Sequence, residues 1–282
     1  MNAPEDFASL SPPPGGAKKY LGRPGAFPEI TRQPIALWLL PAIALLALLP
    51  MSDPARNQAL FLALNQAAGL LPDAFWSALT VLGDSLVALC LLLFFLRRRP
   101  DLALAALLAS VPAALLSHGL KEALDVARPY ALLGDQIHVI GRVLIAGSFP
   151  SGHTTTVFVL AALLVGGLRS ATATPWILLV ALLAGVSRIA VGAHWPLDVL
   201  GGMLCGWACG LLGLYVVRRV DWAARPGVRL AVRLLLIACA MDLYLGYASG
   251  YPLARPFELS IALAALVVHL LPGWALQSGN PR

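Results

Sequence analysis

The sequence predicts an all-α membrane protein, a polytopic bundle of helices that cross the bilayer repeatedly. Only 12% of the 282 residues are charged, whereas a soluble domain typically contains about 25%. Hydrophobic residues make up 59% of the chain, and they gather in repeated runs that approach the roughly 20 residues a membrane-spanning helix needs. We therefore expect a single helical bundle rather than one or two soluble domains.

The chain begins with a polar segment at residues 1–34, rich in Pro and Gly and containing four basic residues. This composition is typical of a polar leader that forms no packed core, and we expect it in the cytoplasm. It is too long and too rich in Pro for the basic start of a secretory signal. No clear cleavage site follows the first apolar run at 35–50, so we expect that run to remain as a membrane span.

Seven apolar runs are near the length that a bilayer demands, and the first run, 35–50, is short for a bilayer. We predict a membrane core at 35–218, and two additional transmembrane helices with a short tail at 219–282. The predicted spans are 35–50, 74–96, 101–120, 153–169, 174–193, 196–217, 232–249 and 256–275.

The basic residues predict the orientation of the bundle, because cytoplasmic loops of membrane proteins carry an excess of Lys and Arg. With the N-terminus in the cytoplasm, 14 of the 20 Lys and Arg residues fall on the inside. The six on the outside are Arg56, Lys121, Arg128, Arg142, Arg188 and Arg255. Membrane topology thus accounts for the net charge of +6, and we expect no nucleic-acid partner.

Three polar motifs interrupt the apolar sequence, and the same topology brings all of them to the outer face. Motif 1 is residues 121–129, with Lys121, Arg128 and Pro129; motif 2 is residues 150–153, Pro-Ser-Gly-His. Motif 3 is residues 187–198, with Ser187, Arg188, His194 and Asp198.

The cations of these motifs are suited to bind a phosphate group. Lys121, Arg128 and Arg188 can neutralise phosphate oxygens, since Arg offers a planar fork and Lys a point charge. Each cation alone could instead be an anchor at the lipid headgroups, but the two histidine motifs beside them favour the phosphate site. Ser151 and Gly152 precede a predicted helix, whose N-terminal amides favour an anion.

The histidines supply the groups for attack and proton transfer. Pro196 suits the first turn of a helix, so Asp198 can reach back to one imidazole nitrogen of His194. The other nitrogen is then free to attack phosphorus and form a phosphohistidine. His153 would protonate the leaving oxygen and later activate water.

These residues resemble the phosphatidic acid phosphatase type 2 superfamily, whose pattern is K-x6-R-P, then P-S-G-H, then S-R-x5-H-x3-D. The sequence matches every specified position, from Lys121 to Asp198. The resemblance implies a six-helix core, a histidine nucleophile, no metal ion or other cofactor, and hydrolysis of phosphate esters or anhydrides. It says nothing about the last two spans.

We expect the substrate to be a lipid phosphate or diphosphate, such as phosphatidic acid, phosphatidylglycerophosphate or undecaprenyl diphosphate, cleaved at the outer leaflet of a bacterial inner membrane. A site at the helix ends can receive a headgroup while the lipid tail stays in the bilayer. Two alternatives remain open: a phosphotransferase that passes the phosphohistidine to another lipid, and a non-catalytic lipid transporter on the same scaffold. The motifs do not distinguish the phosphatase from the transferase.

The remaining polar residues have less definite predictions. Asp84 and Asp242 lie within predicted spans, where a carboxylate is either functional or a hydrogen-bonded helix contact. We favour structural roles for three further histidines and for the four cysteines, and close helix packing for three glycines spaced four residues apart. These residues are His118, His138, His269, Cys90, Cys205, Cys209, Cys239, Gly202, Gly206 and Gly210.

Overall fold

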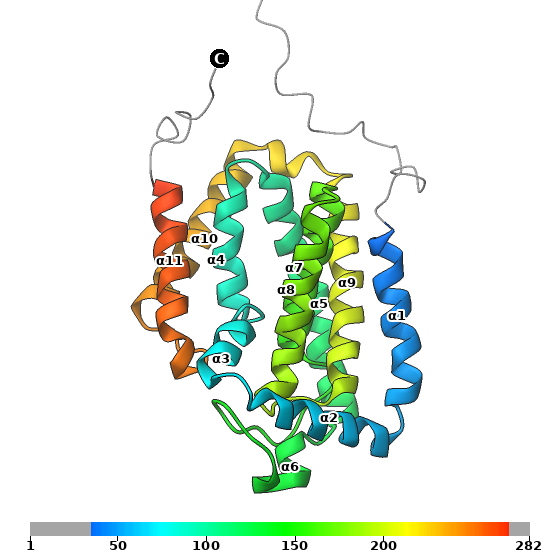
Figure 1. Ribbon diagram of the computed structural model, residues 1–282. Helices are drawn as coiled ribbons and strands as arrows, with labels where there is room; N and C mark the ends of the chain where they lie inside the picture. Colours follow the sequence, from blue (N-terminus) through cyan, green and yellow to red (C-terminus); the bar gives the residue numbers. More distant parts are fainter. Residues whose placement is uncertain (1–34, 271–282) are drawn as a thin grey trace, which may run out of the picture.

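The computed structural model describes residues 35–270 and consists, over that part of the chain, of helices and connecting loops without a β-strand. The predicted all-α bundle is therefore confirmed (Figure 1). The predicted leader at 1–34 and the end of the last predicted span, with the tail that follows it, lie outside the described residues.

The helices follow the predicted spans closely, with two additions on the side that carries the motifs. In chain order they are α1 (Ala36–Met51), α2 (Pro54–Ala68), α3 (Asp73–Val81), α4 (Ser85–Leu96), α5 (Pro100–Leu124), α6 (Pro129–Leu133), α7 (Gly152–Leu168), α8 (Ala173–Ala190), α9 (Pro196–Val217), α10 (Pro226–Leu245) and α11 (Arg255–Leu270).

The surface of the bundle is that of an integral membrane protein. Large apolar side chains face outward along the helices, among them Leu46 at 68% and Leu115 at 70% exposure. Of the described helices, 4 are long and apolar enough to cross a membrane, or up to 6 if each bent pair is counted as one span. The apolar helix α7 is shorter, with 17 residues, and α10 is not among the candidates.

The structure corrects the predicted spans in two places. In each place, two successive helices meet at a sharp angle. The predicted span at 74–96 is two helices, α3 and α4, which meet at 65°. Asp84 ends the continuity because its carboxylate caps α4, accepting from the amides of Leu86 and Val87 at 2.9 and 3.3 Å. Helix α2 was not predicted; it turns 111° away from α1 and lies across the end of the bundle (Figure 1).

The central contact of the fold joins α7 to α9. Helix α7 begins within motif 2, and α9 begins at the end of motif 3. A Cβ added at Gly206 would lie 2.2 Å from the Thr155 carbonyl oxygen, and one at Gly210 would lie 2.8 Å from the Ala162 Cβ. The glycines of α9 therefore allow the two backbones to touch, as the four-residue spacing predicted.

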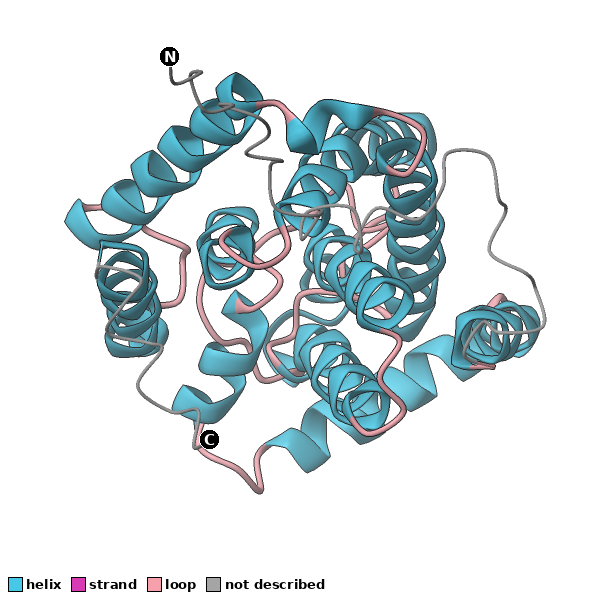
Figure 2. Ribbon diagram, turned by 90° about the horizontal axis from the view of Figure 1, so that it is seen from above, coloured by secondary structure: helices cyan, strands magenta, loops and turns pink. Residues whose placement is uncertain are grey.

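The helices at the periphery lie on opposite sides of this centre. Helix α1 stands at one edge of the bundle, and the C-terminal pair α10 and α11 at the other, packed against α4 (Figure 2). The three motifs meet at the end of the bundle that α2 crosses, whereas the loop arginines at 97–99 and 218–219 lie at the opposite end (Figure 1).

Candidate active site

The fold gathers the predicted site residues from five segments of the chain. Lys121 lies in the last turn of α5, and Arg188 in the last turn of α8. Arg128 has extended backbone immediately before α6, the conformation that a following proline favours. His194 lies in the turn between α8 and α9, and Ser151 is the residue that caps α7.

His194 and Asp198 form a buried pair at the start of α9. The Nδ1 atom of His194 lies 3.3 Å from Oδ2 of Asp198, and the two residues are only 2% and 1% exposed. The same carboxylate oxygen accepts from the Trp195 amide at 2.8 Å and from the hydroxyl of Ser148. Since a carboxylate only accepts hydrogen bonds, the proton of His194 belongs on Nδ1, and Nε2 carries the lone pair.

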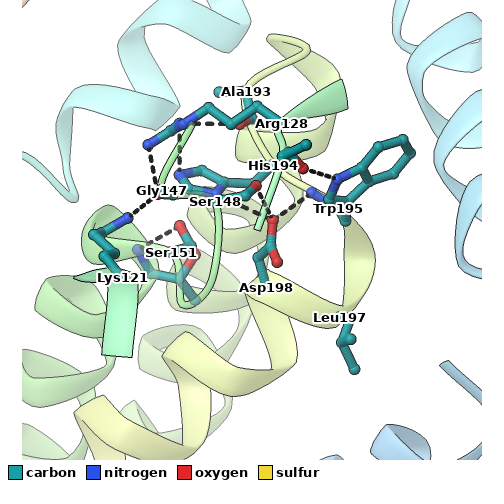
Figure 3. Close-up of polar contacts among 12 residues, drawn as sticks. Lys121, Arg128, Gly147, Ser148, Ser151, Ala193, His194, Trp195, Leu197 and Asp198 are labelled. Atoms are coloured by element: carbon teal, nitrogen blue, oxygen red, sulfur yellow. Dashed lines mark hydrogen bonds and ion pairs between the residues drawn. The ribbon is translucent and has the colours of Figure 1, made fainter. Parts of the chain in front are cut away.

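The lone pair of His194 points toward a cation. The Nη1 atom of Arg128 lies 3.2 Å from Nε2 of His194, and the same guanidinium donates to the carbonyl oxygens of Ala146, Gly147 and Ala193 at 2.8–3.2 Å. The ammonium of Lys121 donates to the Gly147 carbonyl at 2.7 Å. Figure 3 shows Lys121 and Arg128 converging on this loop beside His194.

The electrostatics of the pocket keep His194 neutral. Burial lowers the pKa of His194 well below its usual value of 6.5, and the positive charges of Arg128, Arg188 and Lys121 lower this pKa further. Because a neutral imidazole retains its lone pair, Nε2 is available to attack an electrophile at neutral pH.

Among the described residues, six buried side-chain atoms have no hydrogen-bond partner, and two of the six belong to motifs 2 and 3. These two are Nε of Arg188 and Nε2 of His153. The Nη1 atom of Arg188 is engaged, since it donates to Thr80 and to the Tyr251 hydroxyl. Unpaired polar atoms are uncommon inside proteins, and these two belong to residues that the motifs predicted to contact a phosphate and its leaving group.

Motif 2 also has a structural role. The Ser151 hydroxyl is fully buried and accepts from the Thr154 amide at 3.4 Å and from the Thr154 hydroxyl at 2.9 Å. One of the amides expected to be free at the start of α7 is therefore capped by Ser151. The Ser151 amide donates to the Asp198 carbonyl at 3.0 Å, which joins motif 2 to motif 3.

Sequence reasoning missed several residues of this site. Ser148 and the carbonyls of Ala146 and Gly147 precede motif 2 in a loop without a recognisable pattern. Thr80 reaches Arg188 from α3, and Tyr251 reaches it from the segment between α10 and α11. No periodicity or spacing signals such contacts, because they depend on the packing of α3 and of the C-terminal segment.

The structure also locates the other polar residues singled out in the sequence. Asp84 caps α4 and accepts from the Tyr247 hydroxyl at 2.7 Å, so it is a hydrogen-bonded helix contact. His138 pairs with Asp73 at 2.9 Å, and His118 is exposed. His269 is buried near the far end of α11, and Asp242 is exposed in the last turn of α10. All four cysteines are free.

A helical bundle with this surface and a buried histidine surrounded by cations defines an integral membrane protein of the phosphatase class. The chain belongs to the PAP2 superfamily, whose family model matches residues 100–222. Among solved structures it is similar to LpxE of Aquifex aeolicus, with 34% identity and a TM-score of 0.52 over 56% of this chain and 93% of that chain.

A second similar structure is the transmembrane PAP2-type phosphatidylglycerolphosphate phosphatase of Bacillus subtilis. Its identity to this chain is 27% and its TM-score 0.44, with 69% of this chain and 98% of that chain covered. Comparison with curated proteins finds no match. The family match covers all three motifs and ends before α10.

Proposed function

We propose that this protein hydrolyses a lipid phosphate or lipid diphosphate through a phosphohistidine intermediate. The observation that carries the proposal is the buried His194, which has Asp198 on Nδ1 and a lone pair on Nε2 beside Arg128. Phosphatidic acid, phosphatidylglycerophosphate and undecaprenyl diphosphate fit this chemistry, because each presents a terminal phosphate on a membrane anchor.

In the first step, the phosphate displaces the carbonyl oxygens as the acceptor for Lys121 and Arg128, and Nε of Arg188 gains its missing partner. Neutralising the oxygens permits attack on phosphorus. Nε2 of His194 forms the N–P bond, and the bond from phosphorus to the lipid oxygen breaks. His153, protonated beside the bound phosphate, gives that oxygen a proton and becomes neutral. Asp198 stabilises the positive charge that develops on the imidazole.

In the second step, His153 removes a proton from water, and the hydroxide oxygen attacks the phosphohistidine. The N–P bond breaks, inorganic phosphate leaves, and His194 returns to its neutral state. Three cations within one pocket supply the positive charge that a metal ion provides in many other phosphatases. The proposed reaction therefore needs no metal ion or other cofactor.

The position of the site supports a lipid substrate. The motif residues meet at one end of the bundle, where a headgroup can bind while its tail remains in the bilayer. The arginine-rich loops at the other end favour a cytoplasmic position for that end. We therefore propose that the site faces the outer leaflet, with the N-terminus in the cytoplasm of a bacterial cell.

The proposal is tested by phosphate release from the three lipids, with purified protein in detergent. His194→Ala should reduce release by more than a thousandfold while the protein remains folded, because no helix of the bundle depends on the imidazole. The wild type should accumulate a phosphoenzyme that is labile in acid and stable in base, and His194→Ala should not. Wild-type release should continue in EDTA.

Each alternative has its own outcome. Substantial phosphate release by folded His194→Ala would exclude His194 as the nucleophile. Loss of activity in EDTA that one divalent ion restores would indicate metal chemistry. Phosphoenzyme formation without phosphate release, relieved by adding a second lipid as acceptor, would identify a phosphotransferase.

A further inference from the structure

The segment between the two C-terminal helices contributes a side chain that contacts Arg188. Tyr251 lies between α10 and α11, beyond the residues that the family model matches. It is 7% exposed, and its hydroxyl accepts from Nη1 of Arg188 at 2.7 Å. Its ring centroid lies 5.6 Å from the guanidinium carbon of Arg188 and 6.5 Å from the ring centroid of His153.

The contact with Tyr251 determines which edge of Arg188 remains open. A guanidinium has five N–H donors in a fixed fork, two of them on Nη1. The hydroxyls of Tyr251 and Thr80 accept the two hydrogen bonds that Nη1 can donate. The edge formed by Nε and Nη2 therefore remains available, and Nε is buried without a hydrogen-bond partner. This is one of the edges with which Arg binds two oxygens of a phosphate at once.

Tyr251 is held in place from several directions. Gly141, with φ of +83°, lies against its ring, since a Cβ on Gly141 would meet the ring at 2.8 Å. The guanidinium of Arg255 donates to the carbonyls of Leu243 and Tyr244, at the end of α10, at 2.7 and 2.9 Å. The segment therefore has the rigidity that a positioning contact requires.

We propose that Tyr251 is a positioning residue, which fixes the guanidinium of Arg188 with its Nε–Nη2 edge toward the substrate phosphate. This inference builds on the proposed function, since it assumes that Arg188 binds the phosphate of the substrate. It assigns the C-terminal pair of helices a role at the site: they complete the wall of the phosphate pocket on the side of Arg188 and His153.

The test compares Tyr251→Phe, which keeps the ring, with Tyr251→Leu, which removes the ring as well. Tyr247→Phe is the matched control, because it removes a tyrosine hydroxyl from the same segment without touching Arg188. For each protein, kcat/KM for phosphate release is measured together with the Kd for orthovanadate, obtained from the ligand-induced rise in melting temperature.

Tyr251→Phe should lower kcat/KM and weaken vanadate binding by the same factor, about tenfold, the lower end of what one hydrogen bond to a charged group contributes. Tyr251→Leu should weaken both by about a hundredfold, since the contact between cation and ring is lost too. Tyr247→Phe should leave both within about twofold of the wild type, even where it lowers the melting temperature.

Vanadate affinity within twofold of the wild type in Tyr251→Phe would overturn the proposal, and so would an equal loss in Tyr247→Phe, which would indicate a structural role only. The binding readout does not depend on catalysis. A wild type that binds vanadate but hydrolyses none of the three lipids would refute the proposed hydrolysis, while the vanadate comparison would still decide the role of Tyr251.

Discussion

Replacing Asp198 by Asn tests the electrostatic part of the reaction while changing very little of the site's shape. The amide oxygen of Asn can still accept from the Trp195 amide and the Ser148 hydroxyl, as Oδ2 of Asp198 does. What disappears is the negative charge beside Nδ1 of His194, 3.3 Å away. That charge matters most when the imidazole becomes positive on attacking phosphorus.

The magnitude follows from this distance. Two unit charges 3.3 Å apart interact by about 5 kcal/mol at an effective dielectric constant of about 20. A loss of 5 kcal/mol corresponds to between three and four orders of magnitude in rate, at about 1.4 kcal/mol for each factor of ten. Because the charge is only partly developed in the transition state, we expect kcat to fall by about a hundredfold to a thousandfold.

The assay is phosphate release at saturating lipid, with KM and the melting temperature measured on the same preparations. KM should change by less than about threefold, because Asp198 does not contact the bound phosphate directly. Asp73→Asn is the matched control: it neutralises the carboxylate of a second His–Asp pair, with His138, whose side chains are exposed. Solvent screens that pair, so kcat should stay within about twofold. A kcat for Asp198→Asn within tenfold of the wild type would refute the electrostatic role.

Two further predictions concern pH and packing. Because the pKa of His194 lies well below 6.5, protonation of His194 should lower kcat/KM by less than about twofold between pH 7.5 and 5.5. A histidine with an ordinary pKa would be about nine-tenths protonated at pH 5.5, and kcat/KM would then fall by about tenfold. A decrease of that size with a midpoint near 6.5, beyond the part that the ionisation of the substrate phosphate near pH 6 accounts for, would contradict the neutral histidine. Gly206→Ala should lower the free energy of unfolding by about 1–3 kcal/mol, because the added Cβ would lie 2.2 Å from the Thr155 carbonyl oxygen. Gly119→Ala on α5, where no atom lies within 4 Å of the added Cβ, should be neutral or slightly stabilising, and equal losses in thermal unfolding of the two variants would show that the contact between α7 and α9 is not tight.

The parts of the fold that could be predicted are those with a strong local signal. Apolar runs predicted the helices of the bundle, and the spacing of His194 and Asp198 predicted their contact, because residues four apart lie on one face of a helical turn. Helix α2 was missed because polar residues on both sides limit its apolar run to residues 59–64. One of these polar residues, Asn65, is buried through hydrogen bonds to the carbonyls of Ile189 and Ala190, both at 3.1 Å. The bend before α4 was missed because an apolar run gives no sign of it.

The site was predicted as far as its residues belong to the three motifs. Lys121, Arg128 and His194 lie close together. The sequence did not indicate that Lys121 and Arg128 also donate hydrogen bonds to the loop carbonyls at 146–147. Tyr251 could not be predicted, since it reaches Arg188 across 63 positions of sequence. The packing of the C-terminal segment against α3 and α4 brings these two residues together.

The contact between α7 and α9 limits how the pocket can open. Where helices meet through side chains, a change of rotamers lets them slide, but here the glycines of α9 meet the backbone and Cβ atoms of α7 directly. The Ser151 amide also donates to the Asp198 carbonyl. The starts of these two helices, which carry His153 and Asp198, therefore move as one rigid body. The passage of a lipid headgroup therefore has to come from a part of the site outside this contact, such as the loop that joins α6 to α7, so the width of the opening and the spacing of the reacting groups are set by different regions of the chain.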